Sequence, residues 1–152
     1  MTTVLTIGVA GNGAERIAEA LHGFGRVKVM VIPEYLRSSN DFDIFVLNAP
    51  PGREGILNTQ AAALVINSDA DGILSSIPTG YAGLIITYGF NNKACVTASS
   101  VSEDTCSICV QRGFTDISGQ PHNPGEFNFN CSECTPEAAL AAASALMAGG
   151  VI

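Results

Sequence analysis

A glycine-rich turn near the N-terminus is the first segment whose residue types suggest binding chemistry. A short β-branched run leads into Gly8, Gly11, Asn12 and Gly13, and the following Ala14–Leu21 has apolar residues at helical spacing. Glycines between a strand and a helix let the backbone approach a pyrophosphate, and a helix N-terminus attracts anions. The same glycines also let a strand turn tightly into a helix without any ligand. The turn therefore predicts a nucleotide or anion site, with a purely conformational role as the alternative.

An acidic residue, Glu34, follows the glycine turn about 20 residues further on, where dinucleotide-binding folds place an acid for the ribose. This spacing leaves open a small NAD(P)- or nucleotide-binding enzyme that uses the Gly8/Gly11/Gly13 turn. The two histidines, His22 and His122, lie beside glycine and proline, and no Ser or Cys nucleophile motif accompanies them. We predict that both are surface residues and not catalysts.

A second group of candidate ligand-binding residues follows a buried strand in the middle of the chain. Asn67, Asp69 and Asp71 come directly after the apolar run Leu64–Ile66. Their side chains can hydrogen-bond a base or a ribose, and they can equally end the strand and shape a turn. The sequence leaves both roles open.

The five cysteines include two CxxC pairs, Cys106 with Cys109 and Cys131 with Cys134, a spacing that suits tetrahedral zinc. The first pair lies in a β-rich run, and residues three apart on a regular strand point to opposite faces. The second pair precedes a helix N-terminus, where a thiolate is stabilised and reactive. We expect free thiols that pack as small hydrophobes, and a zinc-stabilised interaction module is the alternative.

Composition limits the classes of partner. The 152 residues fit one domain, 1–152, with 47% hydrophobic and 14% charged residues, a balance typical of a buried parallel sheet. A net charge of −7 and the absence of Trp argue against nucleic acid and anionic membranes as partners. The N-terminus has no signal-peptide pattern and no apolar run is long enough to span a bilayer, so we expect a soluble cytoplasmic protein.

The elements that must position these residues alternate between strands and helices. Strand, glycine turn, helix and a second, buried strand at Val27–Ile32 open the chain, and further strands are predicted at Asp43–Leu47, Leu64–Asn67 and Leu84–Tyr88. A β-hairpin is expected over Ala94–Gln111 and a loop over Gly119–Glu126. Last comes an Ala-rich helix that Thr135 caps, with Pro136 in its first turn and Gly149 after its end. The prediction is an α/β fold: a Rossmann-like or P-loop-like, doubly wound, mainly parallel sheet with a β-hairpin extension.

Three segments in the second half of the chain resemble the central ATP-binding domain of the Mur ligases. Ala63–Asp69 is similar to the strand that ends in Asn-x-Asp beside the nucleotide. Ile85–Ser99 is similar to the "TYG…ADV.A" segment, and Pro124–Asn128 with the following Ala-rich helix resembles the "PG.HN…NALAA" segment. They occur in the order and at the spacing of the family over residues 60–150, and they imply the ATP-binding fold of that domain.

The first half departs from the family where its chemistry lies. The glycine turn takes the place of the phosphate loop "GTNGKTT", but Asn12 stands at the lysine and Gly13 at the metal-binding threonine. The strand Asp43–Leu47 ends in Asn48, where the family has a metal-binding Glu, and the following "SS" is replaced by Pro50 and Pro51. No counterpart of the modified catalytic lysine is found, and 152 residues leave no room for the two substrate domains. The resemblance therefore implies a degenerate, truncated core without ligase activity.

The sequence leads to a ranked set of hypotheses. The first is a non-catalytic Mur-ligase-like protein that binds ATP, another nucleotide-like ligand or a protein partner, with a link to cell-wall precursor metabolism. The runner-up is the NAD(P)- or nucleotide-binding enzyme, and the third is the zinc-stabilised module. Because neither neighbouring domain is present to cover apolar surface, a homo-oligomer is also expected, with contacts around Val96–Val110.

Overall fold

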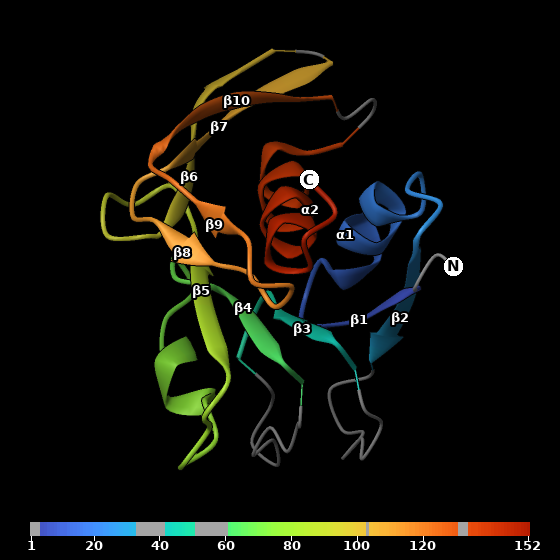
Figure 1. Cartoon of the computed structure of the whole chain (residues 1–152), viewed down its shortest axis with the longest axis vertical. Helices are drawn as coiled ribbons and strands as arrows, with labels where there is room; N and C mark the ends of the chain where they lie inside the picture. Colours follow the sequence, from blue (N-terminus) through green and yellow to red (C-terminus); the bar gives the residue numbers. More distant parts are fainter. Residues whose placement is uncertain (1–3, 33–41, 51–60, 103, 131–133) are drawn as a thin grey trace.

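The computed structural model describes residues 4–32, 42–50, 61–102, 104–130 and 134–152, and these form a large mixed sheet with helices packed on it and a separate two-stranded sheet (Figure 1). The main sheet of the described residues has eight strands in the order β10-β7-β6-β5-β4-β3-β1-β2. Their bounds are Leu5–Ala10 for β1, Val27–Ile32 for β2, Ile44–Leu47 for β3, Ala63–Asn67 for β4, Leu84–Tyr88 for β5, Val96–Val101 for β6, Thr105–Val110 for β7 and Gly125–Asn130 for β10. The helices are α1 (Ala14–Leu21), α2 (Pro136–Ala148) and the short 3₁₀ helix η1 (Ile73–Ser76).

Each neighbouring pair among β2, β1, β3, β4, β5 and β6 is parallel, and β7 and β10 extend the sheet with antiparallel pairing. Successive residues of β3 and β4 are buried on opposite faces, and each of these two strands contributes side chains to two separate apolar clusters. Burial on both faces is the usual reason why parallel strands are continuous apolar runs. The predicted α/β class with a mainly parallel sheet is confirmed.

Both α-helices lie side by side on one face of the sheet (Figure 1). The described residues on the opposite face include η1 and its buried Ile73, which packs with Phe45, Leu64 and Ile66. A doubly wound sheet carries helices on both faces. The described residues place no α-helix on this second face, so the doubly wound arrangement stays a prediction.

Helix α2 is a central core element, enclosed by α1 and by strands from β3 to β7. Every residue from Ala138 to Ala148 is buried, which the small alanine side chains permit because they let the helix approach the sheet closely. The predicted start is confirmed: Thr135 Oγ1 accepts the N–H of Ala138 at 3.2 Å, and Pro136 is the first residue of the helix.

The hairpin of β6 and β7 is confirmed, but predictions about two other segments are wrong. The loop predicted at Gly119–Glu126 extends too far, because Gly125 and Glu126 already belong to strand β10, which pairs with β7 and turns Phe129 into the core. Two prolines obscured the alternation of polar and aromatic residues that follows them. Strand β2 was expected to be buried, yet it lies at the edge of the sheet, where Met30 and Val31 are exposed.

No helix among the described residues is long and apolar enough to cross a membrane. The longest, α2, has 13 residues. Its apolar character is explained by its position inside the domain, where every face of the helix has a protein neighbour.

Candidate functional site

A pocket of about 360 Å³ lies at the carboxyl ends of β1 and β3, where α1 and α2 begin. Its lining comes from the turn before α1, the first turns of both helices and the end of β3: Asn12, Gly13, Arg16, Ile17, Asn48, Thr135, Glu137 and Ala138. In open α/β sheets, ligands bind outside the carboxyl ends of the strands. The predicted residues Asn12 and Gly13 therefore lie at the expected edge of the sheet.

The three predicted glycines have different roles. Gly11 and Gly13 have φ of +97° and +87°, a left-handed backbone that strongly favours glycine, and a side chain on Gly11 would meet the backbone nitrogen of Ala49 at 2.5 Å. Gly8 lies within β1, away from the pocket, where a side chain would meet the ring of Phe42 at 2.9 Å. Gly8 therefore does not line this pocket, and its lack of a side chain makes room for an aromatic ring in the core.

Four polar residues from different strand ends form a hydrogen-bonded cluster beside the pocket, and we call it the amide cluster: Asn12, Asn48, Asn67 and Tyr88. Asn48 is its centre, because its Nδ2 donates to the carbonyl of Asn12 at 2.6 Å and its Oδ1 accepts the Tyr88 hydroxyl at 2.7 Å. Asn67 Nδ2 donates to the carbonyl of Asn48 at 3.0 Å. Tyr88 is buried, and its pKa is raised by burial and by the negative charge of Asp69, so its hydroxyl remains a donor.

The carboxylate of Asp69 holds the connection between β5 and β6. It accepts the N–H of Phe90 at 2.7 Å and the side-chain amide of Asn91 at 2.6 Å. Burial alone would raise the pKa of Asp69, but the hydrogen bonds from Asn91 and Phe90 lower it. The carboxylate also lies so close to Gly89 that a side chain there would meet it at 2.7 Å. The structure therefore brings Asn67 to the candidate site and gives Asp69 a loop-stabilising contact.

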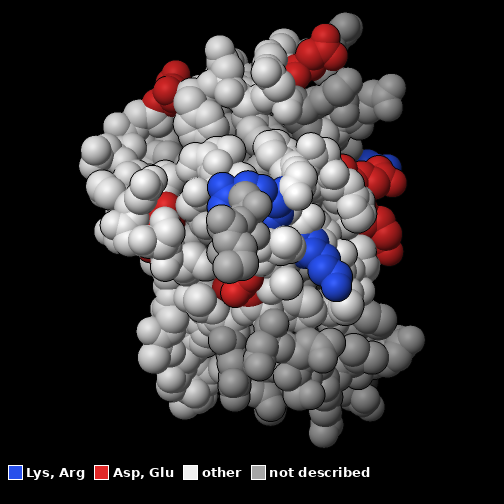
Figure 2. Space-filling model, turned by 45° about the vertical axis from the view of Figure 1, so that its right-hand side comes forward, with Lys and Arg blue, Asp and Glu red and all other residues white. Residues whose placement is uncertain are grey.

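The electrostatics of the pocket favour an anion at one end. The N-termini of α1 and α2 both open onto it, and Arg16 forms no ion pair within the part of the chain that the structure describes. Glu137 is the acidic residue of the lining. On the face shown in Figure 2, most of the visible Lys and Arg atoms lie near the centre, and the Asp and Glu atoms lie mainly toward the rim. Arg16 and Thr135 in the pocket lining were not identified as binding residues from the sequence, because they lie at helix starts and match no motif.

The cysteines that the structure describes do not form a shared ligand set. Cys106 is buried, whereas Cys109, three residues on in the same strand, is half-exposed and faces the other side. Cys134 is disulfide-bonded, so the expectation of free thiols is wrong for this residue, and Cys131 lies outside the described residues. CxxC spacing is shared by disulfides and metal sites, and spacing alone did not distinguish them. Among the described residues no group of three or more His, Cys, Asp or Glu side chains has the geometry of a metal site.

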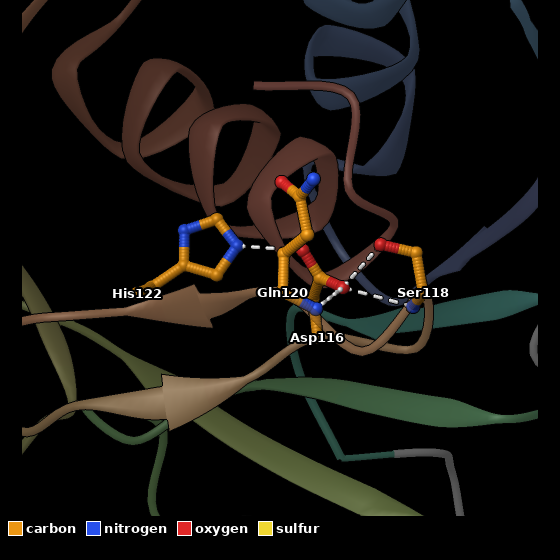
Figure 3. Close-up of polar contacts among 4 residues, drawn as sticks. All are labelled: Asp116, Ser118, Gln120 and His122. Carbon is orange, nitrogen blue, oxygen red and sulfur yellow. Dashed lines mark hydrogen bonds and ion pairs between the residues drawn. The ribbon is translucent and has the colours of Figure 1, made fainter.

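A second polar centre, missed by sequence reasoning, lies in the hairpin of β8 (Phe114–Thr115) and β9 (Pro121–His122) (Figure 3). The buried carboxylate of Asp116 accepts the N–H and the hydroxyl of Ser118 at 2.8 and 2.6 Å and the N–H of Gln120 at 3.1 Å. His122 Nε2 lies 2.8 Å from Asp116 Oδ2, and its ring stacks on Phe114. The predicted surface position of His122 is wrong, because only 14% of its side chain is exposed.

Burial alone would raise the pKa of Asp116, but the hydrogen bonds from Ser118, His122 and Gln120 lower it. The carboxylate is thus held ionised by groups of its own hairpin. The members of this centre bond to one another within the segment 114–122, so the arrangement stabilises the hairpin and is not a catalytic triad.

Comparison with protein-family models finds no match, and comparison with curated proteins finds none either. Glu34, the proposed ribose ligand of the dinucleotide alternative, lies outside the described residues.

Proposed function

We propose that this protein is a non-catalytic, Mur-ligase-like core that binds the phosphate end of a nucleotide-like ligand in the pocket between α1 and α2. The observation that carries the proposal is the pocket itself: two helix N-termini, Arg16 and the turn before α1 meet at the carboxyl edge of a parallel sheet. Its volume of about 360 Å³ accommodates a phosphate or pyrophosphate group with part of a nucleoside.

The contacts of the pocket suit binding without group transfer. Asn12 and Asn48 are neutral, and the side chain of Asn48 is already engaged by Asn12 and Tyr88. A catalytic phosphate site needs a cation on the terminal phosphate and ligands for Mg²⁺. The residues that the Mur resemblance places at those positions supply neither group, and Gly13 additionally has a left-handed backbone that a threonine would strain. The link to cell-wall precursor metabolism rests on the resemblance alone.

Calorimetric titration with pyrophosphate and with ADP, each with and without Mg²⁺, tests the proposal directly. Binding should occur without the metal and should weaken as salt is added, because the attraction is electrostatic and partly exposed. Arg16→Gln should weaken it about five- to tenfold, the loss of roughly one charge-assisted hydrogen bond. ATP supplied with Mg²⁺ should not be hydrolysed.

Arg26→Gln is the matched control, because Arg26 is an exposed arginine that lines a different pocket. The proposal fails if both variants bind alike, or if neither pyrophosphate nor ADP binds at millimolar concentration. Steady ATP turnover that is lost in an Asn12→Ala variant would contradict the non-catalytic interpretation.

The alternative of a protein partner, first of all a second copy of this chain, is favoured by exposed apolar side chains near the hairpin. Val101 on β6 and Phe90, just after β5, are 51% and 47% exposed. Sedimentation at micromolar concentration should give twice the 15.7 kDa chain mass. Val101→Ser with Phe90→Ser should return the protein to a monomer, whereas a monomeric starting protein would rule out this assembly.

A further inference from the structure

A cysteine, a threonine and an arginine meet where β5 passes to β6, and none of them belongs to the pocket. Cys95 directly precedes β6, and its N–H donates to the hydroxyl oxygen of Thr87 on β5 at 3.0 Å. Its carbonyl accepts the N–H of Gln111 at 2.7 Å, just after β7. Cys95 is therefore fixed by backbone contacts to the ends of two strands.

Arg112 brings a positive charge to the sulfur. Its Nη2 lies 3.6 Å from Cys95 Sγ and also donates to the carbonyl of Lys93, which anchors the guanidinium in this position. Thr87 supplies two further donors to the sulfur, its backbone amide and its hydroxyl. The hydroxyl can donate because its oxygen is the acceptor of the Cys95 N–H, which leaves the hydroxyl hydrogen for the sulfur. Burial alone would raise the pKa of Cys95, but hydrogen bonds from the amide and hydroxyl of Thr87 and the charge and hydrogen bond of Arg112 lower it.

The other free cysteines provide comparisons within the same chain. Cys106 is buried in the apolar core, and burial raises its pKa. Cys109 is half-exposed like Cys95, but among the described residues its sulfur has no hydrogen-bond donor comparable with Arg112. A thiolate needs both access and stabilising donors to react, and Cys95 is the cysteine in this set that has both.

We propose that Cys95 is a modification site that hydroperoxides oxidise reversibly, with Arg112 and Thr87 as its positioning residues. The thiolate sulfur attacks one oxygen of the peroxide, an S–O bond forms and the O–O bond breaks. The departing hydroxide, or alkoxide for an organic peroxide, takes up the proton that the thiol released on ionisation and leaves as water or an alcohol. The product is the sulfenic acid of Cys95. One low-molecular-weight thiol condenses with it to a mixed disulfide and releases water, and a second such thiol restores the Cys95 thiol and leaves as the small disulfide.

Peptide mass spectrometry of the full chain after brief exposure to hydrogen peroxide and a dicarbonyl probe for sulfenic acid tests this inference. Cys95 should be labelled at least about tenfold faster than Cys109 at neutral pH, because only a stabilised thiolate is abundant there. Alkylation by iodoacetamide over a pH series should show Cys95 reacting at lower pH than Cys106. These two measurements need no variant and so do not depend on the folding of one.

Arg112→Gln should slow labelling of Cys95 several-fold and move its alkylation profile to higher pH, with the rate of Cys109 unchanged. Lys93→Gln is the matched control, because it removes a nearby positive charge whose side chain makes no contact with the sulfur. Equal rates at Cys95 and Cys109, or equal effects of the two variants, would overturn the proposal.

Discussion

The amide cluster around Asn48 and the hairpin centre around Asp116 are both partly buried polar groups, but they differ in charge and in where their partners come from. Asn48 is neutral and joins three strand ends that lie 19 to 40 residues away in sequence. Asp116 is ionised, and its partners are two to six residues away. A charge buried in a protein needs complete pairing, whereas a neutral amide is buried at lower cost. The charged centre therefore stabilises one hairpin, and the neutral one organises the edge of the candidate site.

Replacing Asp116 by Asn should have the largest effect on stability. The change removes the charge that pairs with His122 and one of the oxygens that accept from Ser118 and His122. Removing one partner of a buried pair typically costs about 3 kcal/mol of unfolding free energy. Urea unfolding at pH 7 measures the loss, and Glu126→Gln, an exposed carboxylate on β10, should be nearly neutral. A loss below about 1 kcal/mol would mean that the charge of Asp116 contributes little to the stability of the hairpin.

The stability lost in the Asp116→Asn variant should depend on pH. Because the folded-state pKa of Asp116 is lowered, the carboxylate stabilises the fold above the ordinary pKa of about 4 and this contribution is lost as the pH falls through the folded pKa. The stability difference between the protein and its Asp116→Asn variant should therefore be full at pH 6 and shrink below about pH 4. A difference that stays constant down to pH 2.5 would show that the carboxylate is not selectively stabilised in the folded hairpin.

A substitution in the turn before α1 should have the next largest effect on stability. Gly11→Ala places a side chain against the Ala49 backbone and forces a left-handed residue, so it should cost at least about 2 kcal/mol. Gly23→Ala is the matched control, because open space surrounds Gly23 and its φ is not positive. That variant should lie within about 1 kcal/mol of the parent protein in thermal unfolding. Equal stability of the two variants would remove the conformational argument for the turn.

Sequence patterns predicted the elements that are determined by residues close together in the sequence. The α1 limits, the cap of α2 by Thr135 and the hairpin of β6 and β7 follow from periodicity, capping residues and turn composition. Strand β10 and the edge position of β2 were missed, because sheet order is decided by packing and not by local propensity.

The candidate site was predicted only where a motif marked it. The glycine turn and Asn67 stand at recognisable positions, and the structure brings Asn12, Gly13 and Asn67 to one edge of the sheet. Arg16 lines the pocket because of its position on α1, and no short sequence motif marks that position. Asp116 and His122 were also missed, since their meeting depends on a hairpin whose strands have only two residues each.

Asn48→Asp tests whether the neutral character of the amide cluster matters. An aspartate can still accept from Tyr88, but it cannot donate to the carbonyl of Asn12 and would place two oxygens against each other. The expected cost is about 1–2 kcal/mol at neutral pH. In Asn128→Asp, the control, the side chain only accepts a hydrogen bond, from Ser107, so that change should be nearly neutral. A stable Asn48→Asp variant that gains Mg²⁺-dependent nucleotide binding would instead support a recoverable metal site.

Tyr88→Phe should have the smallest effect of the series, although Tyr88 is the largest fully buried side chain of the core. The change removes only the hydroxyl, which donates to Asn48 Oδ1 at 2.7 Å, and it keeps the ring in its place in the apolar cluster. Asn48 Oδ1 retains a weaker donor in Asn67 Nδ2 at 3.4 Å, so no buried acceptor is left without a partner. The cost should therefore be about 1 kcal/mol, close to that of one neutral hydrogen bond and well below that of Asp116→Asn. Urea unfolding of Tyr88→Phe and Asp116→Asn under the same conditions gives the two losses of unfolding free energy. Equal losses would show that charge does not distinguish the two polar centres.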